Sequence, residues 1–107
     1  MTISQRRIEE VAARLGKASR ARKVILFGSC AAGVPRDDSD VDFLVISDSS
    51  LPRHKRSRQL YALFDEYPFP MDILVYTPRE VEAGVRTPNS FVARVMAQGK
   101  EVYAARS

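Results

Sequence analysis

Three aspartates fall at positions where two expected strands could bring their carboxylates together. Asp40 directly precedes the apolar run over residues 41–46, and Asp42 is the second residue of that run. Asp72 interrupts another apolar run. Side chains two residues apart on a strand point to the same face, and Asp72 joins the other two if its strand pairs beside theirs. Carboxylates this close repel each other and favour a bound cation. The pattern predicts a site for Mg²⁺ or Mn²⁺, which carboxylates hold together with substrate phosphates.

A Gly-Ser pair ends the apolar run that precedes these acids. Gly28 permits a ligand to approach the backbone closely, and Ser29 offers a hydroxyl donor. A short helix is expected to follow through residues 30–32, and the free amides at a helix start favour phosphate oxygens. The pair therefore predicts a site for a triphosphate tail beside the metal ions, as nucleotidyl transfer through two metals requires.

Each feature also has a purely structural interpretation. Residues 37–39 are typical of turns, so Asp40 and Asp42 could be the solvated end of a strand. Asp72 could be an edge-strand acid that faces water. The Gly-Ser pair could be a strand-to-helix turn in which the serine caps the helix.

Helices and strands that must position these residues alternate along the chain. An amphipathic helix is expected over residues 4–16, capped by Ser4 and ended by Gly16, and a second over residues 51–67, with Pro52 as a favoured first residue. The other expected elements are strands over residues 24–27, 41–46 and 69–76, short helices from Thr77 to about Gly84 and from Asn89 or Ser90 onward, and an edge strand or tail over residues 101–103. This order predicts one α/β (α+β) domain over residues 1–107, with a small mixed sheet of three or four strands flanked by helices.

Composition narrows the class of protein. A length of 107 residues suits a single domain, and a net charge of +4 is too small an excess to identify an anionic partner. Cys30 is the only cysteine, which excludes an internal disulfide. The N-terminus lacks the apolar core of a signal peptide, and no apolar run is long enough to span a bilayer. A soluble, cytoplasmic protein without membrane association is expected.

Two other groups of residues favour ordinary structural roles. Five basic side chains within residues 53–58 are typical of a solvated helix face, with nucleic acid or an acidic partner as the alternative. Cys30 and His54 could suggest a thiol nucleophile with its base, but no third group is evident to orient the histidine.

The spacing of these motifs resembles the signature of the nucleotidyltransferase superfamily that includes DNA polymerase beta. Gly28-Ser29 is followed after ten residues by Asp40-x-Asp42, and Asp72 lies on a following strand. The segments FGS, AxG and SDVDFLV, together with the short chain, resemble its minimal nucleotidyltransferase (MNT) branch in particular. The resemblance runs over residues 24–76 and implies the polymerase beta-like palm fold.

The same resemblance implies a role for each acid. Asp40 and Asp42 would bind two Mg²⁺ ions, with Mn²⁺ as a substitute. Asp72 would help to hold the catalytic ion and would assist deprotonation of the attacking hydroxyl.

Phosphate contacts follow from the resemblance as well. Gly28 and Ser29 would contact the β- and γ-phosphates of ATP or another nucleoside triphosphate. Family members commonly carry an arginine at the position of Ala32. Arg36, or a residue elsewhere, would have to replace that phosphate contact.

Minimal nucleotidyltransferases of prokaryotes often act as antitoxins beside a helical HEPN partner, and some transfer AMP to a tyrosine of that partner. The resemblance thus implies an Mg²⁺-dependent enzyme that transfers a nucleoside monophosphate, AMP from ATP, to a hydroxyl acceptor such as that tyrosine. Two alternatives remain open. One is a catalytically weak or inactive nucleotide-binding antitoxin that works by binding its partner, and the other is a basic nucleic-acid-binding domain.

Overall fold

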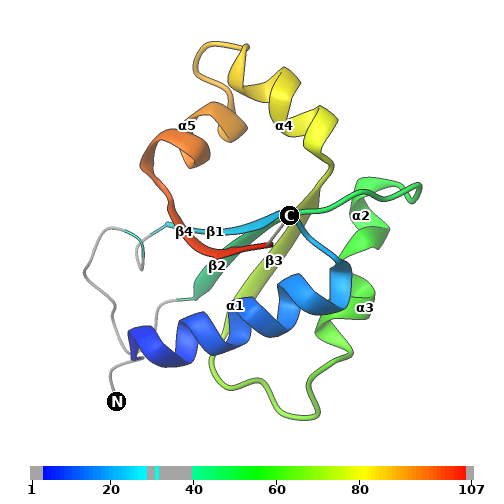
Figure 1. Ribbon diagram of the computed structural model, residues 1–107, viewed down its shortest axis with the longest axis vertical. Helices are drawn as coiled ribbons and strands as arrows, with labels where there is room; N and C mark the ends of the chain where they lie inside the picture. The colour runs from blue at the N-terminus through cyan, green and yellow to red at the C-terminus, as the bar shows by residue number, and fades with distance from the viewer. Residues whose placement is uncertain (1–3, 29–30, 32–39, 106–107) are drawn as a thin grey trace.

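A mixed β-sheet with helices on both faces forms the fold (Figure 1). The computed structural model describes residues 4–28, 31 and 40–105. Within these residues the strands lie in the order β3-β2-β1-β4; β1 is antiparallel to β2 and β4, whereas β2 and β3 are parallel. The elements are α1 (Gln5–Ser19), β1 (Lys23–Phe27), β2 (Val41–Ile46), α2 (Arg53–Arg56), α3 (Arg58–Tyr61), β3 (Met71–Tyr76), α4 (Pro78–Val85), α5 (Phe91–Gln98) and β4 (Lys100–Ala104). The predicted class of fold is confirmed.

The alternation of side chains along the strands divides the core into two layers. Odd-numbered residues of β2, such as the fully buried Phe43, pack with α1 and α3. Even-numbered residues, such as Leu44, pack with residues of α4 and α5. These two helices lie on the other face of the sheet (Figure 1). Asp42 and Asp72 occupy even-numbered positions of β2 and β3, so the sheet directs both toward the face that α4 and α5 partly cover.

Helix α1 is longer than the sequence predicts. It begins after the Ser4 cap as expected, but it continues through Gly16 and ends at Ser19, where Arg20 adopts a left-handed backbone with φ of 54°. Gly16 is buried within the helix. The ring of Tyr103 in β4 lies where a Cβ would be, so a larger residue would not fit here. The glycine therefore serves packing and does not end the helix. Although α1 is the longest helix of the described residues, none of the helices there is long and apolar enough to cross a membrane.

Two single helical turns replace the helix that was expected over residues 51–67. α2 and α3 are separated at Ser57, and Pro52 precedes α2 instead of opening it. A continuous helix would stack the basic side chains of residues 53–58 above one another at destabilising spacings. Arg56 is the last residue of α2 before this break, and its side chain is only 9% exposed.

The C-terminal elements agree closely with the sequence predictions. β3 begins two residues later than expected, after Pro70, which has no amide to give to the ladder. Thr77 caps α4 and forms a capping box with Glu80. Ser90, and not Asn89, caps α5. β4 is an edge strand rather than a tail, and it pairs with β1.

Side chains from α2 and α3 close the outer edge of β3. In a parallel pair, alternate residues of β3 direct their backbone groups away from β2. The Ile73 amide donates to the Tyr61 hydroxyl at 2.8 Å, and the Arg56 guanidinium donates to the Val75 carbonyl at 3.2 Å. These bonds occupy groups that an extended segment would need in order to pair here, which protects the edge against strand addition.

Candidate active site

Asp42 and Asp72 occupy neighbouring positions on the parallel strands β2 and β3. They are partners in the strand register, and their carboxyl groups share a side-chain hydrogen bond. Partial burial, and next the charges of Asp72 and Asp40, raise the pKa of Asp42 from 3.8 to about 6. The structure thus brings two of the three predicted site acids into contact, in a setting that disfavours two negative charges.

Asp40 lies immediately before β2, is exposed, and contributes to the negative field at Asp42. Within the described part of the chain, no group of three or more acidic, histidine or cysteine side chains is arranged to hold a metal ion by itself. Mg²⁺ usually needs only one or two carboxylates, because substrate phosphates and water complete its shell. The repulsion between Asp42 and Asp72 fits such an ion, while the role of all three acids as ligands stays a prediction.

Gly28 directly follows β1 and lies beside the Asp42 carboxylate. Its φ of +77° lies in the left-handed region, and a Cβ here would collide with Asp42 Oδ2. The Ala31 amide bonds to the Gly28 carbonyl at 3.1 Å and closes a turn next to the acids. Ser29, Ala32 and Arg36 lie outside the described residues, as does Cys30, so the phosphate contacts expected of Ser29 and Arg36 stay predictions.

The contact between Gly28 and Asp42 makes the glycine sensitive to the smallest substitution. We expect Gly28→Ala to displace the Asp42 carboxylate and to lower the nucleotidyl transfer that the resemblance implies about 100-fold, the effect of a misplacement of about 1 Å. The strained backbone should also lower the free energy of unfolding by about 1–2 kcal/mol. Labelled-nucleotide transfer and urea unfolding measure the two effects.

Gly16→Ala is the matched control, because its new Cβ would meet Tyr103 and not the acids. It should lose stability while it retains transfer activity at temperatures where it is folded. Equal activity losses in the two variants would mean that Gly28 acts through stability alone.

A pocket of about 490 Å³ adjoins this turn, between the end of β1 and α5. Its lining includes Phe27, Gly28, Ala31, Phe91, Arg94 and Gln98. The rings of Phe27 and Phe91 meet edge to face with centroids 5.5 Å apart. In the sequence the apolar residues of α5 indicate core packing, with a surface for a partner helix as the alternative. Nothing in the sequence shows that this helix faces Gly28.

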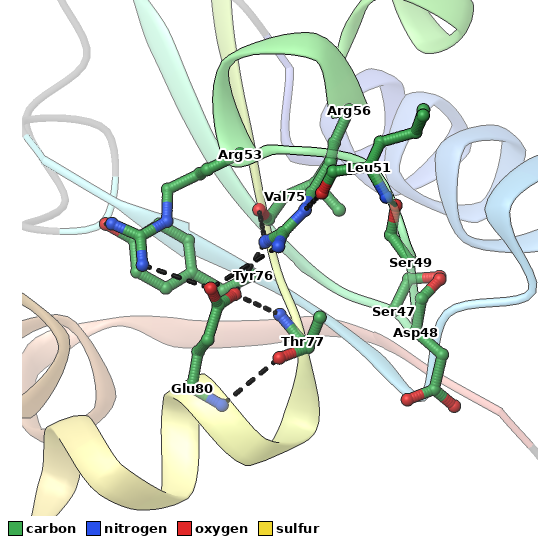
Figure 2. Close-up of polar contacts among 10 residues, drawn as sticks. All are labelled: Ser47, Asp48, Ser49, Leu51, Arg53, Arg56, Val75, Tyr76, Thr77 and Glu80. Atoms are coloured by element: carbon green, nitrogen blue, oxygen red, sulfur yellow. Dashed lines mark hydrogen bonds and ion pairs between the residues drawn. The ribbon is translucent and has the colours of Figure 1, made fainter.

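A polar network at the opposite end of β2 and β3 joins α2 to α4 (Figure 2). Arg56 Nη1 lies 2.5 Å from Glu80 Oε1, and Arg53 Nη2 lies 3.1 Å from Glu80 Oε2. The Arg53 guanidinium also stacks over the Tyr76 ring, 4.2 Å from its centroid. The hydrogen bond from Arg56 is the main cause that lowers the pKa of Glu80 to about 2. Two of the five basic side chains of residues 53–58 therefore pair with Glu80, which reduces the positive charge that this surface offers to nucleic acid.

Comparison with known families identifies the class of protein. The family model described as "Nucleotidyltransferase domain" matches residues 6–104, and the chain therefore belongs to this family. A solved structure titled "Crystal structure of the toxin-antitoxin with AMP-PNP" is similar over 92% of this chain and 74% of its own, with a TM-score of 0.57 and 19% identity. At this identity the likeness concerns the fold. Comparison with curated proteins found no match. The resemblance to the nucleotidyltransferase superfamily and the predicted fold are confirmed.

Proposed function

We propose that this protein transfers a nucleoside monophosphate, AMP from ATP, to a hydroxyl acceptor with the help of Mg²⁺. One observation carries the proposal: the Asp42 carboxyl group contacts both Asp72 and the turn at Gly28. Carboxylates suited to a hard cation and a glycine suited to phosphate therefore lie within the span of one nucleotide. Membership of the nucleotidyltransferase domain family supports this assignment.

The three acids would share the metal ions, and Asp72 would have a second task. Asp42 and Asp72, with Asp40 beside them, would hold the Mg²⁺ ions, for which Mn²⁺ could substitute. When bound, the metal would neutralise phosphate charge and make the attacking hydroxyl more acidic. Asp72 is exposed on the edge strand, where an acceptor hydroxyl can reach it and transfer its proton to the carboxylate. A bond forms from the acceptor oxygen to the α-phosphorus, and the bond to pyrophosphate breaks.

A partner protein would supply the acceptor. The exposed position of Asp72 leaves the acceptor side of the site open. A toxin-antitoxin crystallised with AMP-PNP shares the fold, which favours an antitoxin role with ATP as donor. We therefore include in the proposal a helical toxin of the HEPN type, modified on a tyrosine.

Transfer of label tests the enzyme directly. The protein is incubated with Mg²⁺, ATP labelled at the α-phosphate and the product of the neighbouring gene. We expect the neighbour to become labelled, and Asp72→Asn to lower labelling roughly 1,000-fold through loss of several kcal/mol of charge stabilisation. Asp48→Asn is the control, because Asp48 is exposed beyond the other end of β2. Unchanged labelling by Asp72→Asn would contradict the proposed site.

A catalytically inactive antitoxin is the second candidate, favoured by Ala32, where family members commonly carry an arginine. It predicts tight binding of the partner after Asp40 and Asp42 are both replaced by asparagine, with no labelled product from the unaltered protein. Native mass spectrometry of the complex and the labelling assay together separate the two candidates.

Nucleic-acid binding is the remaining alternative, and the engagement of Arg53 and Arg56 by Glu80 argues against it. That function would show an affinity for DNA or RNA that falls steeply with salt concentration.

A further inference from the structure

The pocket between the end of β1 and α5 has a size and a lining that suit a flat organic ring. Its volume of about 490 Å³ falls within the range of roughly 300–1,000 Å³ that is usual for small-molecule sites. Phe27 and Phe91 contribute aromatic surface, and Ala31 adds further apolar surface. These apolar and aromatic walls suit the faces of a nucleobase, which can bury surface against them, better than a strongly hydrated polyphosphate.

Two polar side chains of α5 supplement the apolar walls. Arg94 and Gln98 are four residues apart, so they lie on the same side of the helix, and both line the pocket. Both are exposed. Among the described residues, no carboxylate forms an ion pair with Arg94. A guanidinium can stack on a base, and a primary amide offers a donor and an acceptor to the edge of a purine.

Gly28 connects the pocket to the acids. It lines the pocket and also contacts the Asp42 carboxylate, so both places lie within the reach of a single nucleotide. Resting on the proposed function, we infer that this pocket binds the purine base of the donor nucleotide, with Arg94 against the face of the base and Gln98 at its edge. The phosphates then lie on the Asp42 side of Gly28, with the α-phosphate at Asp42 and Asp72, and the base lies on the α5 side. The chain thereby discriminates purine from pyrimidine triphosphates through α5.

Calorimetric titration with three probes tests this site: α,β-methylene-ATP, CTP and tripolyphosphate, each with Mg²⁺. We expect the unaltered protein to bind the ATP analogue more tightly than CTP. Arg94→Ala and Gln98→Ala should each weaken the ATP analogue about tenfold and leave tripolyphosphate unchanged. Both side chains are exposed, so neither substitution should disturb the fold, and circular dichroism checks this.

Arg86→Ala is the matched control for Arg94→Ala. It removes the same charge from an exposed arginine, 73% accessible, that pairs with Glu82 of α4 outside the pocket. It should leave the affinity for all three probes within twofold of the unaltered protein.

Three results would overturn the inference in distinguishable ways. If Arg94→Ala weakened tripolyphosphate as much as the ATP analogue, the pocket would hold the phosphate tail instead of the base. If both α5 variants bound the analogue normally and still transferred label, the inference would fail while the proposed function stood. If the unaltered protein bound none of the probes and transferred no label, the proposed function would fail with it.

Discussion

Replacing Asp42 by asparagine is expected to make the protein more stable while it abolishes nucleotidyl transfer. The Asp42 carboxyl group is partly buried and lies close to two other acids, and these surroundings raise its pKa to about 6. Asparagine keeps the shape and removes the charge. At pH 7.5 we expect a gain on the order of 1 kcal/mol, reduced by solvent screening, which raises the Tm by about 5 °C for a domain of this size.

The stability gain of Asp42→Asn should depend on pH. Because the pKa of Asp42 is higher in the folded state than its ordinary value of 3.8, the folded state binds the proton more tightly than the unfolded state. The associated stability is fully present below pH 3.8 and is lost as the pH rises to about 6. The Tm difference between Asp42→Asn and the unaltered protein should therefore be small at pH 4 and reach its full size above pH 6.

Mg²⁺ distinguishes a metal site from simple repulsion. The ion should raise the Tm of the unaltered protein at pH 7.5 and should have no such effect on Asp42→Asn, because binding to the folded state alone stabilises it. Asp48→Asn should respond to Mg²⁺ as the unaltered protein does. Thermal unfolding with and without the ion measures both, and an equal Mg²⁺ response in Asp42→Asn would remove this carboxylate from the proposed metal ligands.

The sequence allowed the acidic part of the site to be located because strand geometry is periodic. Val41–Ile46 was expected as a strand with the bounds it has, and the alternation of its side chains put Asp42 on one face. The pairing with Asp72 needed one further condition, that β3 lie beside β2, which the structure meets. Roles for Ser29 and Arg36 depend on residues outside the described part of the chain and stay predictions.

Features that depend on contacts between distant segments could not be predicted from the sequence. Gly16 matches a helix stop locally, and only the position of Tyr103 shows why a glycine stands inside the helix. The pocket beside Gly28 likewise requires α5, some 60 residues later in the chain, to lie across the end of β1. Arg56 belongs to an apparently solvated basic run, yet its side chain is only 9% exposed, and its partner Glu80 lies on a different helix.

Loss of the Glu80 charge should be the most destabilising single change in the polar network. Arg56 is 9% exposed and donates to Glu80, to the Val75 carbonyl and to the Leu51 carbonyl, so the network joins α2, β3 and α4 (Figure 2). Glu80→Gln leaves the largely covered Arg56 guanidinium without its counter-charge. We expect a loss of about 3 kcal/mol in the free energy of unfolding at pH 7, measured by urea denaturation.

The stability contributed by the pair of Arg56 and Glu80 depends on pH in the direction opposite to that of Asp42. The pKa of Glu80 falls from 4.5 to about 2 on folding, chiefly through the Arg56 hydrogen bond, so its contribution is present above pH 4.5 and is lost as the pH falls toward 2. As the pH falls from 4.5 toward 2, the unaltered protein should therefore lose its greater free energy of unfolding relative to Glu80→Gln.

Glu82→Gln is the matched control for Glu80→Gln, because Glu82 pairs with Arg86 on the surface, where the side chains are 65% and 73% exposed. That change should cost less than about 0.5 kcal/mol. Since Ile46 and Tyr76 lie four residues along their strands from Asp42 and Asp72, about 13 Å at strand spacing separates the network from the acids. Glu80→Gln should therefore retain its Mg²⁺ response while folded. A loss of that response at temperatures where the variant is folded would show that the network also positions the acids, through α4 and the contact of Tyr76 with Phe91.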